Sequence, residues 1–236
     1  MRLPLITAHS GCMNTPENSI PSVLEGVKAG AEIIEVDVMA TKDQVVVLRH
    51  DDYVPTPFGN TLVQDLTFEE LKNHMKKEEI IKLEDVLPLI KESNRMINLD
   101  VKEDSAIHPM IQVIEQYKMR DSVIISGCGK ERATYLKNNY RSYQVLLNTN
   151  QSIGMDYEAF IKETCQDAIS ASCCGINIDR NLCREELLDF ARLRCLPVLV
   201  WTVDDVNDMR KFIDMGVHSI TTHEVKKLKE LRESKN

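Results

Sequence analysis

Strand-like and helix-like apolar segments alternate along almost the whole chain, and this alternation restricts the fold more than any other feature. A helix is expected to open near Thr15, because the apolar residues between 20 and 27 follow a helical spacing that Gly30 ends. Strands that are separated by helices pair in parallel through right-handed crossovers. Core strands are expected at residues 3–8, 33–38, 96–101, 123–126, 144–147, 175–178, 197–202 and 219–221. Eight such strands predict an α/β fold that closes into a TIM (β/α)8 barrel.

Length and local composition place the boundaries of this barrel. The 236 residues suit one domain, because barrels of this kind run to about 250 residues. We therefore expect a single barrel domain over residues 1–236, with a short insertion at about 51–80 after the second strand region and a further apolar segment at 45–48. Pro55, Pro57 and Gly59 interrupt regular structure in the insertion, whereas a capping-box pattern at Thr67 predicts a short helix.

Two carboxylates stand inside the apolar segment at 33–38. Glu35 and Asp37 are two residues apart, so the period of a strand puts both on one face. One interpretation is a half-exposed strand whose acids meet water. The other is a buried pair that needs compensation, because burying an unpaired carboxylate costs several kcal/mol and the two charges repel each other. A divalent cation is the simplest compensator, which makes this segment a candidate metal site.

Two histidines accompany the acids at neighbouring strand ends. His9 follows the first strand, and His50 follows the apolar segment at 45–48. A single histidine at a strand end is commonly a satisfied polar residue, but two of them beside the acids favour a reactive site. Chemistry in these barrels sits at the carboxyl ends of the strands, so the four side chains are expected to converge on one mouth.

A set of short motifs runs through the chain in a fixed order, from about Leu3 to about Glu224. The motifs are Ala8-His9, Pro16-Glu17-Asn18-Ser19, Gly30-Ala31, Glu35-Val36-Asp37-Val38, Thr41-Lys42-Asp43, His50-Asp51, Asn98-Leu99-Asp100-Val101-Lys102, Val200-Trp201-Thr202-Val203, Gly216-Val217 and Ile220-Thr221-Thr222. With these motifs at these spacings the chain resembles the glycerophosphodiester phosphodiesterases, a metal-dependent family of (β/α)8 barrels. Each motif alone is weak, and the ordered set is specific.

The resemblance implies a metal site made of three acids. In this site Glu35, Asp37 and Asp100 would bind a divalent cation. Carboxylate oxygens suit a hard ion, whereas zinc would favour a cysteine or a further histidine. The expected cofactor is therefore Mg2+ or Ca2+.

The resemblance also implies roles around the phosphate. His9 and His50 are expected to act as the general acid and base, because imidazole titrates near neutrality, and the sequence leaves open which is which. Lys102 either contacts the phosphate or is a surface lysine whose stem alone is covered. Trp201 either belongs to the core or packs against the glycerol or alcohol moiety. Glu17 either reaches the substrate or stabilises a helix N-terminus.

Three positions depart from the usual pattern of the family. Ser10 replaces an arginine after the first histidine, so it would offer the substrate one weak donor in place of a charged fork. An arginine there is expected to improve turnover if the loop at residues 11–14 admits it, and to clash if the true substrate fills the vacated space. Asp100 stands where glutamate is common and is one methylene shorter, which leaves room for a bridging water. His223 replaces the aspartate usually found after the final Thr-Thr pair.

Charge and hydropathy limit the kinds of partner and the cellular location that the sequence predicts. The formal net charge of −8 disfavours a nucleic-acid surface, which rewards clustered lysine and arginine. The first residues have too short an apolar run for a signal peptide, and no window of about 18 apolar residues would insert stably into a membrane, so a cytoplasmic protein is expected. The seven cysteines lack a paired zinc pattern and are interpreted as reduced thiols. A homo-oligomer is left open.

These inferences favour an enzyme that hydrolyses a small-molecule glycerophosphodiester to glycerol 3-phosphate and an alcohol. One alternative is a catalytically weakened barrel that only binds a phosphorylated ligand, which Ser10 and Asp100 suggest. Another is a phosphodiesterase for a different substrate, such as a lysophospholipid. Both histidines are retained, and this argues against the pure binder because binding alone does not need an acid and a base.

Overall fold

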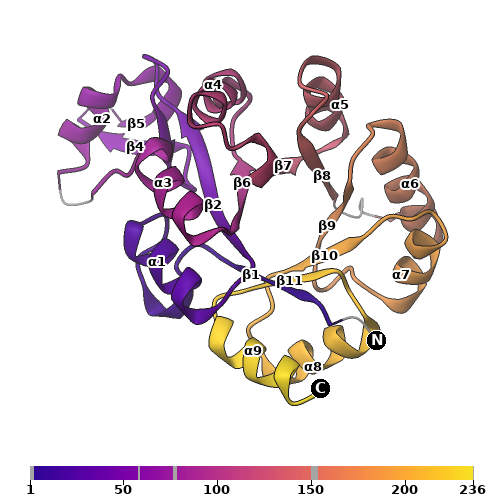
Figure 1. The fold of residues 1–236 in the computed structure, drawn as a ribbon. Coiled ribbons are helices and arrows are strands. Elements are labelled where there is room, and N and C mark those ends of the chain that lie inside the picture. Colours follow the sequence, from indigo (N-terminus) through magenta and orange to yellow (C-terminus); the bar gives the residue numbers. More distant parts are fainter. Residues whose placement is uncertain (1–2, 58, 77–78, 150–153, 236) are drawn as a thin grey trace.

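Eight parallel strands close into a barrel within the residues that the computed structural model describes, which are 3–57, 59–76, 79–149 and 154–235. The strands follow chain order around the barrel, and β1 closes it by pairing with both β2 and β11 (Figure 1). The expected TIM barrel is confirmed. Its strands are β1 (Leu5–Ala8), β2 (Ile33–Ala40), β6 (Met96–Val101), β7 (Val123–Cys128), β8 (Gln144–Thr149), β9 (Gly175–Asp179), β10 (Val198–Trp201) and β11 (Ser219–Thr222).

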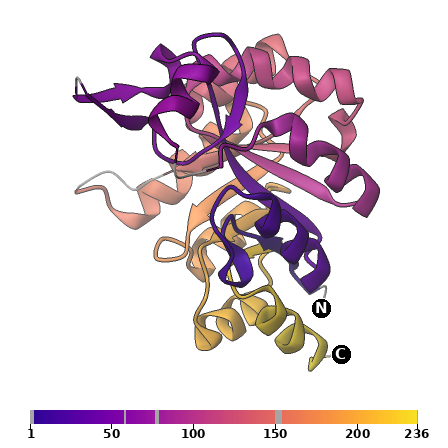
Figure 2. The same cartoon turned by 90° about the vertical axis from the view of Figure 1, so that its left-hand side faces the viewer.

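Helices pack around the outside of the barrel and join successive strands (Figures 1 and 2). The joining helices are α1 (Ile20–Ala29), α3 (Leu83–Ser93), α4 (Ile107–Tyr117), α5 (Lys130–Asn139), α6 (Tyr157–Ser170), α7 (Glu185–Arg192) and α8 (Val206–Met215). Helix α2 (Phe68–His74) lies in the insertion, and α9 (Val225–Glu233) follows the last strand. Short 3-10 helices lie in the connections at Cys12–Asn14, Val63–Asp65, Asp104–Ala106 and Arg120–Ser122. No helix in the described part of the chain is long and apolar enough to cross a membrane.

The first helix begins later than the sequence indicates. Asn18 has a left-handed backbone with φ 52°, so the chain cannot be helical there. Ser19 then caps α1 by accepting a hydrogen bond from the amide of Ser22, and Gly30 ends the helix with φ 97°. The expected start near Thr15 is therefore wrong by about one turn, and the residues before Ser19 form a loop over the end of the barrel.

The insertion after the second strand builds a small structure of its own. It follows β3 (Val46–Leu48), which runs antiparallel to β2, and contains the hairpin of β4 (Tyr53–Thr56) and β5 (Gly59–Leu62) as well as α2. Its apolar cluster consists of Met39, Val47, Val54, Val63, Leu66, Leu71 and Met75. Thr67 and Glu70 exchange the two hydrogen bonds of a capping box at the start of α2, as the sequence predicts. The hairpin is not expected from the sequence, because Pro55 and the polar residues beside it hide the strand pattern.

The main core lies between the barrel strands and the helices. Every residue of β2 is buried, and Phe160 and Phe212 are among the largest fully enclosed side chains. Burial of this apolar surface is the dominant stabilising contribution to such a fold. Buried polar side chains within it need a partner or a function. Several of them face one cavity, which is described next.

Candidate active site

A cavity of about 230 Å3 opens at the carboxyl ends of the barrel strands. It contains all of the site residues predicted from the sequence except Ser10 and Glu17. Its lining consists of His9, Glu35, Asp37, His50, Asn98, Asp100, Lys102, Ser126, Asn148, Asn177, Trp201, Thr202 and Thr221. Residues that lie far apart in the sequence therefore meet in one polar cavity, at the end where barrel enzymes place their chemistry.

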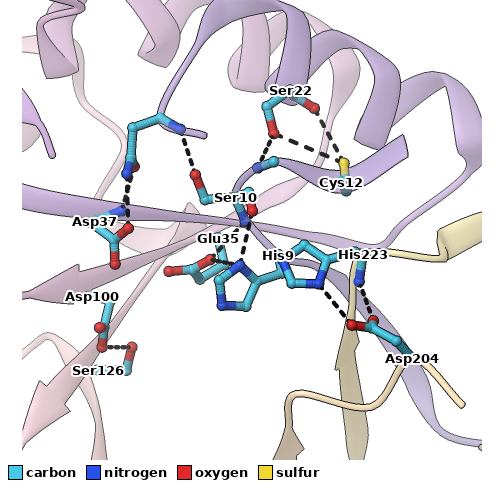
Figure 3. Close-up of polar contacts among 12 residues, drawn as sticks. His9, Ser10, Cys12, Ser22, Glu35, Asp37, Asp100, Ser126, Asp204 and His223 are labelled. Atoms are coloured by element: carbon cyan, nitrogen blue, oxygen red, sulfur yellow. Dashed lines mark hydrogen bonds and ion pairs between the residues drawn. The ribbon is translucent and has the colours of Figure 1, made fainter. Parts of the chain in front are cut away.

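Strand register brings the three acids together. β2 pairs with β6 so that Asp37 lies opposite Asp100, and Glu35 is one inward-facing position earlier on β2. One oxygen from each carboxylate can be chosen so that all three lie within 4.8 Å of one another (Figure 3). Glu35 and Asp37 are buried, with 6% and 3% of their surfaces exposed. The interpretation of a half-exposed strand with wet acids is therefore wrong.

Neighbouring groups hold each carboxylate in place. The backbone amide of Ser10 donates to Glu35 Oε2 at 2.9 Å. Asn18 donates to Asp37 Oδ2 at 2.8 Å and accepts from the Asp37 amide at 3.0 Å, while Ser126 Oγ donates to Asp100 Oδ1 at 2.8 Å. These contacts fix the orientation of the carboxylates before any ligand binds, which is the preorganisation that a metal site requires.

Lys102 is the cation that faces the acids in the structure. Its Nζ lies 2.8 Å from Asp37 Oδ1 and 2.6 Å from Asp100 Oδ2. Burial alone would lower the pKa of Lys102, but the charges of Asp100 and Asp37 raise it above the ordinary value, so the ammonium group stays protonated. Burial, reinforced by the charges of Asp37 and Asp100, raises the pKa of Glu35 well above its ordinary value. The single positive charge of Lys102 therefore does not balance the negative charge that the three carboxyl groups would carry.

The donor set fits a hard divalent cation. Glu35, Asp37 and Asp100 supply anionic oxygens, and the described residues that line the cavity include no cysteine. Asn98 adds a further oxygen: its Oδ1 is buried and has no hydrogen-bond partner among the described residues. A cation coordinated by this cluster would supply the charge that Lys102 alone does not.

The two predicted acid/base histidines lie in different surroundings. His9 Nδ1 is 2.9 Å from the Ser10 carbonyl and 3.7 Å from Glu35 Oε2, and burial lowers the pKa of His9. His50 is more open, with 59% of its side chain exposed, and its Nδ1 lies 2.9 Å from Asp51 Oδ1. Both rings line the cavity. The site therefore presents one enclosed and one solvated imidazole.

The remaining predicted residues divide into two groups. Lys102 and Trp201 line the cavity, and the indole Nε1 of Trp201 is buried without a hydrogen-bond partner in the described part of the chain. Glu17 instead lines a neighbouring cavity beside the insertion, which His50 also borders. Ser10 is 1% exposed, and its Oγ accepts a hydrogen bond from the amide of Asn18. An arginine at position 10 would remove this hydrogen bond, so the gain in turnover stays a prediction that requires the loop to admit the longer side chain.

Several polar residues of the cavity receive no role from the sequence, although three of them stand within the quoted motifs. They are Asn98, Ser126, Asn148, Asn177, Thr202 and Thr221. The strand period that pairs Glu35 with Asp37 would also have placed Asn98 beside Asp100, because they too are two residues apart. The others are uncharged side chains in or directly after barrel strands, and an uncharged residue there does not by itself indicate a site.

A second histidine lies against His9. The ring centroids of His9 and His223 are 4.5 Å apart with a tilt of 43° (Figure 3). His223 Nδ1 is 2.8 Å from Asp204 Oδ2, and the His223 amide donates to Asp204 Oδ1 at 2.8 Å. The sequence identifies His223 only as a departure from the family pattern, and it gives Asp204 no role.

Comparisons with known proteins agree with this geometry. A curated glycerophosphodiester phosphodiesterase from Caldanaerobacter subterraneus subsp. tengcongensis is 28% identical over 235 residues, which cover 92% of this chain and 93% of the relative. A lysophospholipase D from Rattus norvegicus is 24% identical and covers 95% of this chain and 84% of its own length.

Solved structures share the fold. A putative glycerophosphoryl diester phosphodiesterase from Silicibacter pomeroyi superposes with a TM-score of 0.86 at 17% identity, covering 99% of this chain and 94% of the other. An Oleispira antarctica phosphodiesterase, solved with the product sn-glycerol-3-phosphate, gives 0.81 at 20% identity, with 98% and 97% covered. The family model of the glycerophosphoryl diester phosphodiesterases matches residues 9–227. Since that match spans nearly the whole barrel, the chain belongs to the glycerophosphoryl diester phosphodiesterase family.

Proposed function

We propose that this protein is a divalent-cation-dependent enzyme that hydrolyses glycerophosphodiesters to glycerol 3-phosphate and an alcohol. One observation carries the proposal: three preoriented carboxylates, a lysine and two imidazoles line a single cavity. Family membership and the curated relatives support the same chemistry. The product complex of the Oleispira antarctica relative supports a site of this class for glycerol 3-phosphate.

Glu35, Asp37 and Asp100 would hold the cation, with Mg2+ favoured and Ca2+ as the alternative, because all three ligands are carboxylates. When bound, the cation would neutralise the anionic phosphoryl oxygens. Lys102 points its ammonium group at the same cluster and would share the phosphate charge. Trp201 lines the cavity and offers the apolar face of its ring to the glycerol or the alcohol.

His9 suits the role of general base. The Ser10 carbonyl can only accept a hydrogen bond, so we assign the proton of the neutral ring to Nδ1, which leaves the lone pair on Nε2. The lowered pKa of His9 favours that neutral form. His9 would take the proton of the attacking oxygen, either a water or the neighbouring glycerol hydroxyl.

His50 suits the complementary role of general acid. Its Nδ1 lies 2.9 Å from Asp51 Oδ1, a contact that orients the ring. The ring would protonate the alkoxide as the bond from phosphorus to the departing alcohol breaks. Exposure of His50 to solvent allows it to recover its proton afterwards.

Two other functions are weaker candidates. A binder without catalysis remains suggested by Ser10 and Asp100, but Asp100 keeps its place in the acidic triad. A lysophospholipid substrate is suggested by the rat lysophospholipase D relative. A polar cavity of about 230 Å3 favours a small head group, since an acyl chain would have to extend outside it. A cytoplasmic location and a role in lipid metabolism remain predictions, and the oligomeric state stays open.

The test is turnover of glycerophosphocholine and glycerophosphoethanolamine, with lysophosphatidylcholine as comparator. Each is incubated with enzyme that has been stripped of metal and then supplied with Mg2+, Ca2+ or neither. Glycerol phosphate is measured by a coupled assay for the two glycerophosphodiesters, and choline, which is released together with lysophosphatidic acid, is measured for lysophosphatidylcholine. The proposal expects release of glycerol phosphate only with added cation. Binding of glycerol 3-phosphate without any turnover would favour the weakened barrel, and preferential cleavage of lysophosphatidylcholine would favour the other substrate class.

A further inference from the structure

We propose that Asp204 and His223 form a brace that positions the His9 ring for proton transfer. The proposal rests on the function given above, because it takes His9 as the general base. It adds two residues that do not line the cavity and that would act through His9. They are therefore positioning residues, and they come from segments that follow β10 and β11.

The closed barrel brings the two rings into contact. β1 and β11 pair in parallel, with Ala8 opposite Thr222, so His9 and His223 leave neighbouring strands at the same level. The His9 amide also donates to the Thr222 carbonyl at 3.0 Å, which holds the ends of the two strands together. The centroid separation of 4.5 Å is within the range of direct ring packing.

Asp204 fixes His223 through two hydrogen bonds. One carboxylate oxygen accepts from the His223 amide and the other faces the ring at Nδ1, so both the backbone and the side chain are held. Thr222 Oγ1 donates to Asp204 Oδ1 at 3.0 Å and orients the carboxylate in turn. Burial would raise the pKa of Asp204, but the bonds from His223 and Thr222 lower it to about 2, so the acceptor stays ionised near neutrality.

His9 needs such a support because its own contacts are few. Its ring has a hydrogen bond to the Ser10 carbonyl on one edge and lies 3.7 Å from Glu35. His223 packs against the ring from the side away from the acids (Figure 3). Together these contacts restrict rotation of the imidazole, and a general base that shifts by about 1 Å loses roughly 100-fold in rate.

Two substitutions at His223 separate ring packing from polarity. His223→Gln keeps a donor for Asp204 and removes the ring, whereas His223→Phe keeps a ring and removes the donor. The brace predicts that His223→Gln lowers kcat by roughly tenfold with KM changed less than twofold, and that His223→Phe, which keeps the ring packing and loses the bond to Asp204, lowers kcat by roughly threefold. His108→Gln is the matched control, because His108 bonds Tyr140 and does not line the cavity, and it should keep full activity.

A third variant tests whether the pair acts as a unit. Asp204→Ala should lower kcat in the wild-type background and add little in the His223→Gln background, because its effect passes through the same ring. Mg2+ affinity, measured by calorimetry on each folded variant, should stay within twofold of wild type. A change in metal affinity would place these residues with the acidic triad and overturn the brace.

The outcomes distinguish this proposal from the function on which it rests. If His9→Ala is inactive and His223→Gln keeps wild-type kcat, the brace is wrong and the proposed function stands. A raised KM with unchanged kcat in His223→Gln would make His223 a binding residue and overturn the brace as well. If His9→Ala itself stays active, the base has been assigned wrongly and both proposals fail.

Discussion

At the scale of single residues, the acidic triad concentrates negative charge that Lys102 only partly offsets. Replacing Glu35 by Gln or Asp37 by Asn removes one charged ligand oxygen and keeps the size of the side chain. We predict that each change weakens Mg2+ or Ca2+ binding by roughly tenfold or more, because affinity at oxygen sites follows the count of charged ligands. Isothermal titration of the stripped protein measures this. Full activity in the presence of EDTA would contradict the metal dependence.

The two cavity histidines should affect rate more than affinity. His9→Ala and His50→Ala are each expected to lower kcat by about 100-fold or more, the usual scale for a lost general acid or base. KM should change much less, because neither ring is proposed as the main phosphate contact. Steady-state kinetics on glycerophosphocholine provide the measurement. If both variants turn over at wild-type rates, proton transfer must be assigned to other groups.

The pair of His223 and Asp204 should also make stability depend on pH. The hydrogen bond to Asp204, opposed by burial, raises the pKa of His223 above its ordinary value of about 6.5. The folded state then binds the proton more tightly than the unfolded state, so this contribution is fully present below about pH 6.5 and is lost as pH rises through the folded pKa. Thermal unfolding in EDTA should show wild type exceeding His223→Gln by more at pH 5.5 than at pH 9. An equal difference at both pH values would contradict the linkage.

At the scale of elements, the end of β6 depends on how closely β7 approaches it. Gly127 in β7 has φ 72°, and a Cβ there would lie 2.5 Å from the Val101 carbonyl oxygen and 2.9 Å from Asp100 Oδ1. Arg132 of α5 donates to the carbonyls of both Val101 and Gly127 and clamps the two strands at this point. The approach of β7 thus fixes the strand end that carries Asp100 and Lys102.

Gly127→Ala is therefore expected to weaken both folding and metal binding. Gly216→Ala is the matched comparison, because Gly216 has φ 73° but open space around its Cα. Left-handed strain alone should cost about 1–2 kcal/mol in Gly216→Ala and leave the Mg2+ affinity unchanged. Gly127→Ala should cost more, since it adds a clash, and should lower Mg2+ affinity through the displaced Asp100. Equal effects of the two changes in urea unfolding and calorimetry would contradict this role for Gly127.

The elements that the sequence predicts well are those whose pattern is local. The barrel strands follow from short apolar runs between helices, and the inward pair of Glu35 and Asp37 follows from the period of one strand. The loop before α1 could not be predicted, because the left-handed backbone of Asn18 is supported by its hydrogen bonds with Asp37 of β2. Contacts of this kind depend on tertiary structure and leave no periodic signal in the chain.

The contact between His9 and His223 also depends on tertiary structure. No local sequence pattern around either histidine indicates that the two rings meet. Only the closure of the barrel makes their strands adjacent. Closure itself was predicted, so the proximity of the first and last strand ends could have been inferred, but the involvement of Asp204 could not. The enclosed position of Ser10 likewise depends on the fold of the loop that ends at Asn18.

At the scale of the whole molecule, we predict that barrel and insertion unfold together as one domain. Both share β2, since Met39 on β2 packs into the apolar cluster of the insertion while Val36 and Val38 belong to the main core. Circular dichroism and tryptophan fluorescence should therefore report the same midpoint. Two separate transitions would make the insertion an independent unit.

Metal should raise that midpoint. A ligand that binds only the folded state at 100 times its Kd adds about 2.7 kcal/mol, which corresponds to roughly 5–10 °C for a protein of this size. We expect this shift with Mg2+ or Ca2+ in wild type and a much smaller one in Glu35→Gln. An identical shift in both proteins would mean that the cation acts elsewhere.

The seam between β1 and β11 has a consequence for the protein while it is being made. Thr7 Oγ1 and Ser219 Oγ are 2.8 Å apart across this seam, although 212 residues separate them in the chain. During synthesis β1 leaves the ribosome early, and it cannot pair with β11 until residues 219–223 have emerged. Before then one edge of β1 has no partner strand, and His9 has neither the Thr222 carbonyl nor the His223 ring beside it. The surroundings of His9 are therefore completed only at the end of synthesis. Any chaperone that assists this protein would have to shield β1 for nearly the whole of that time.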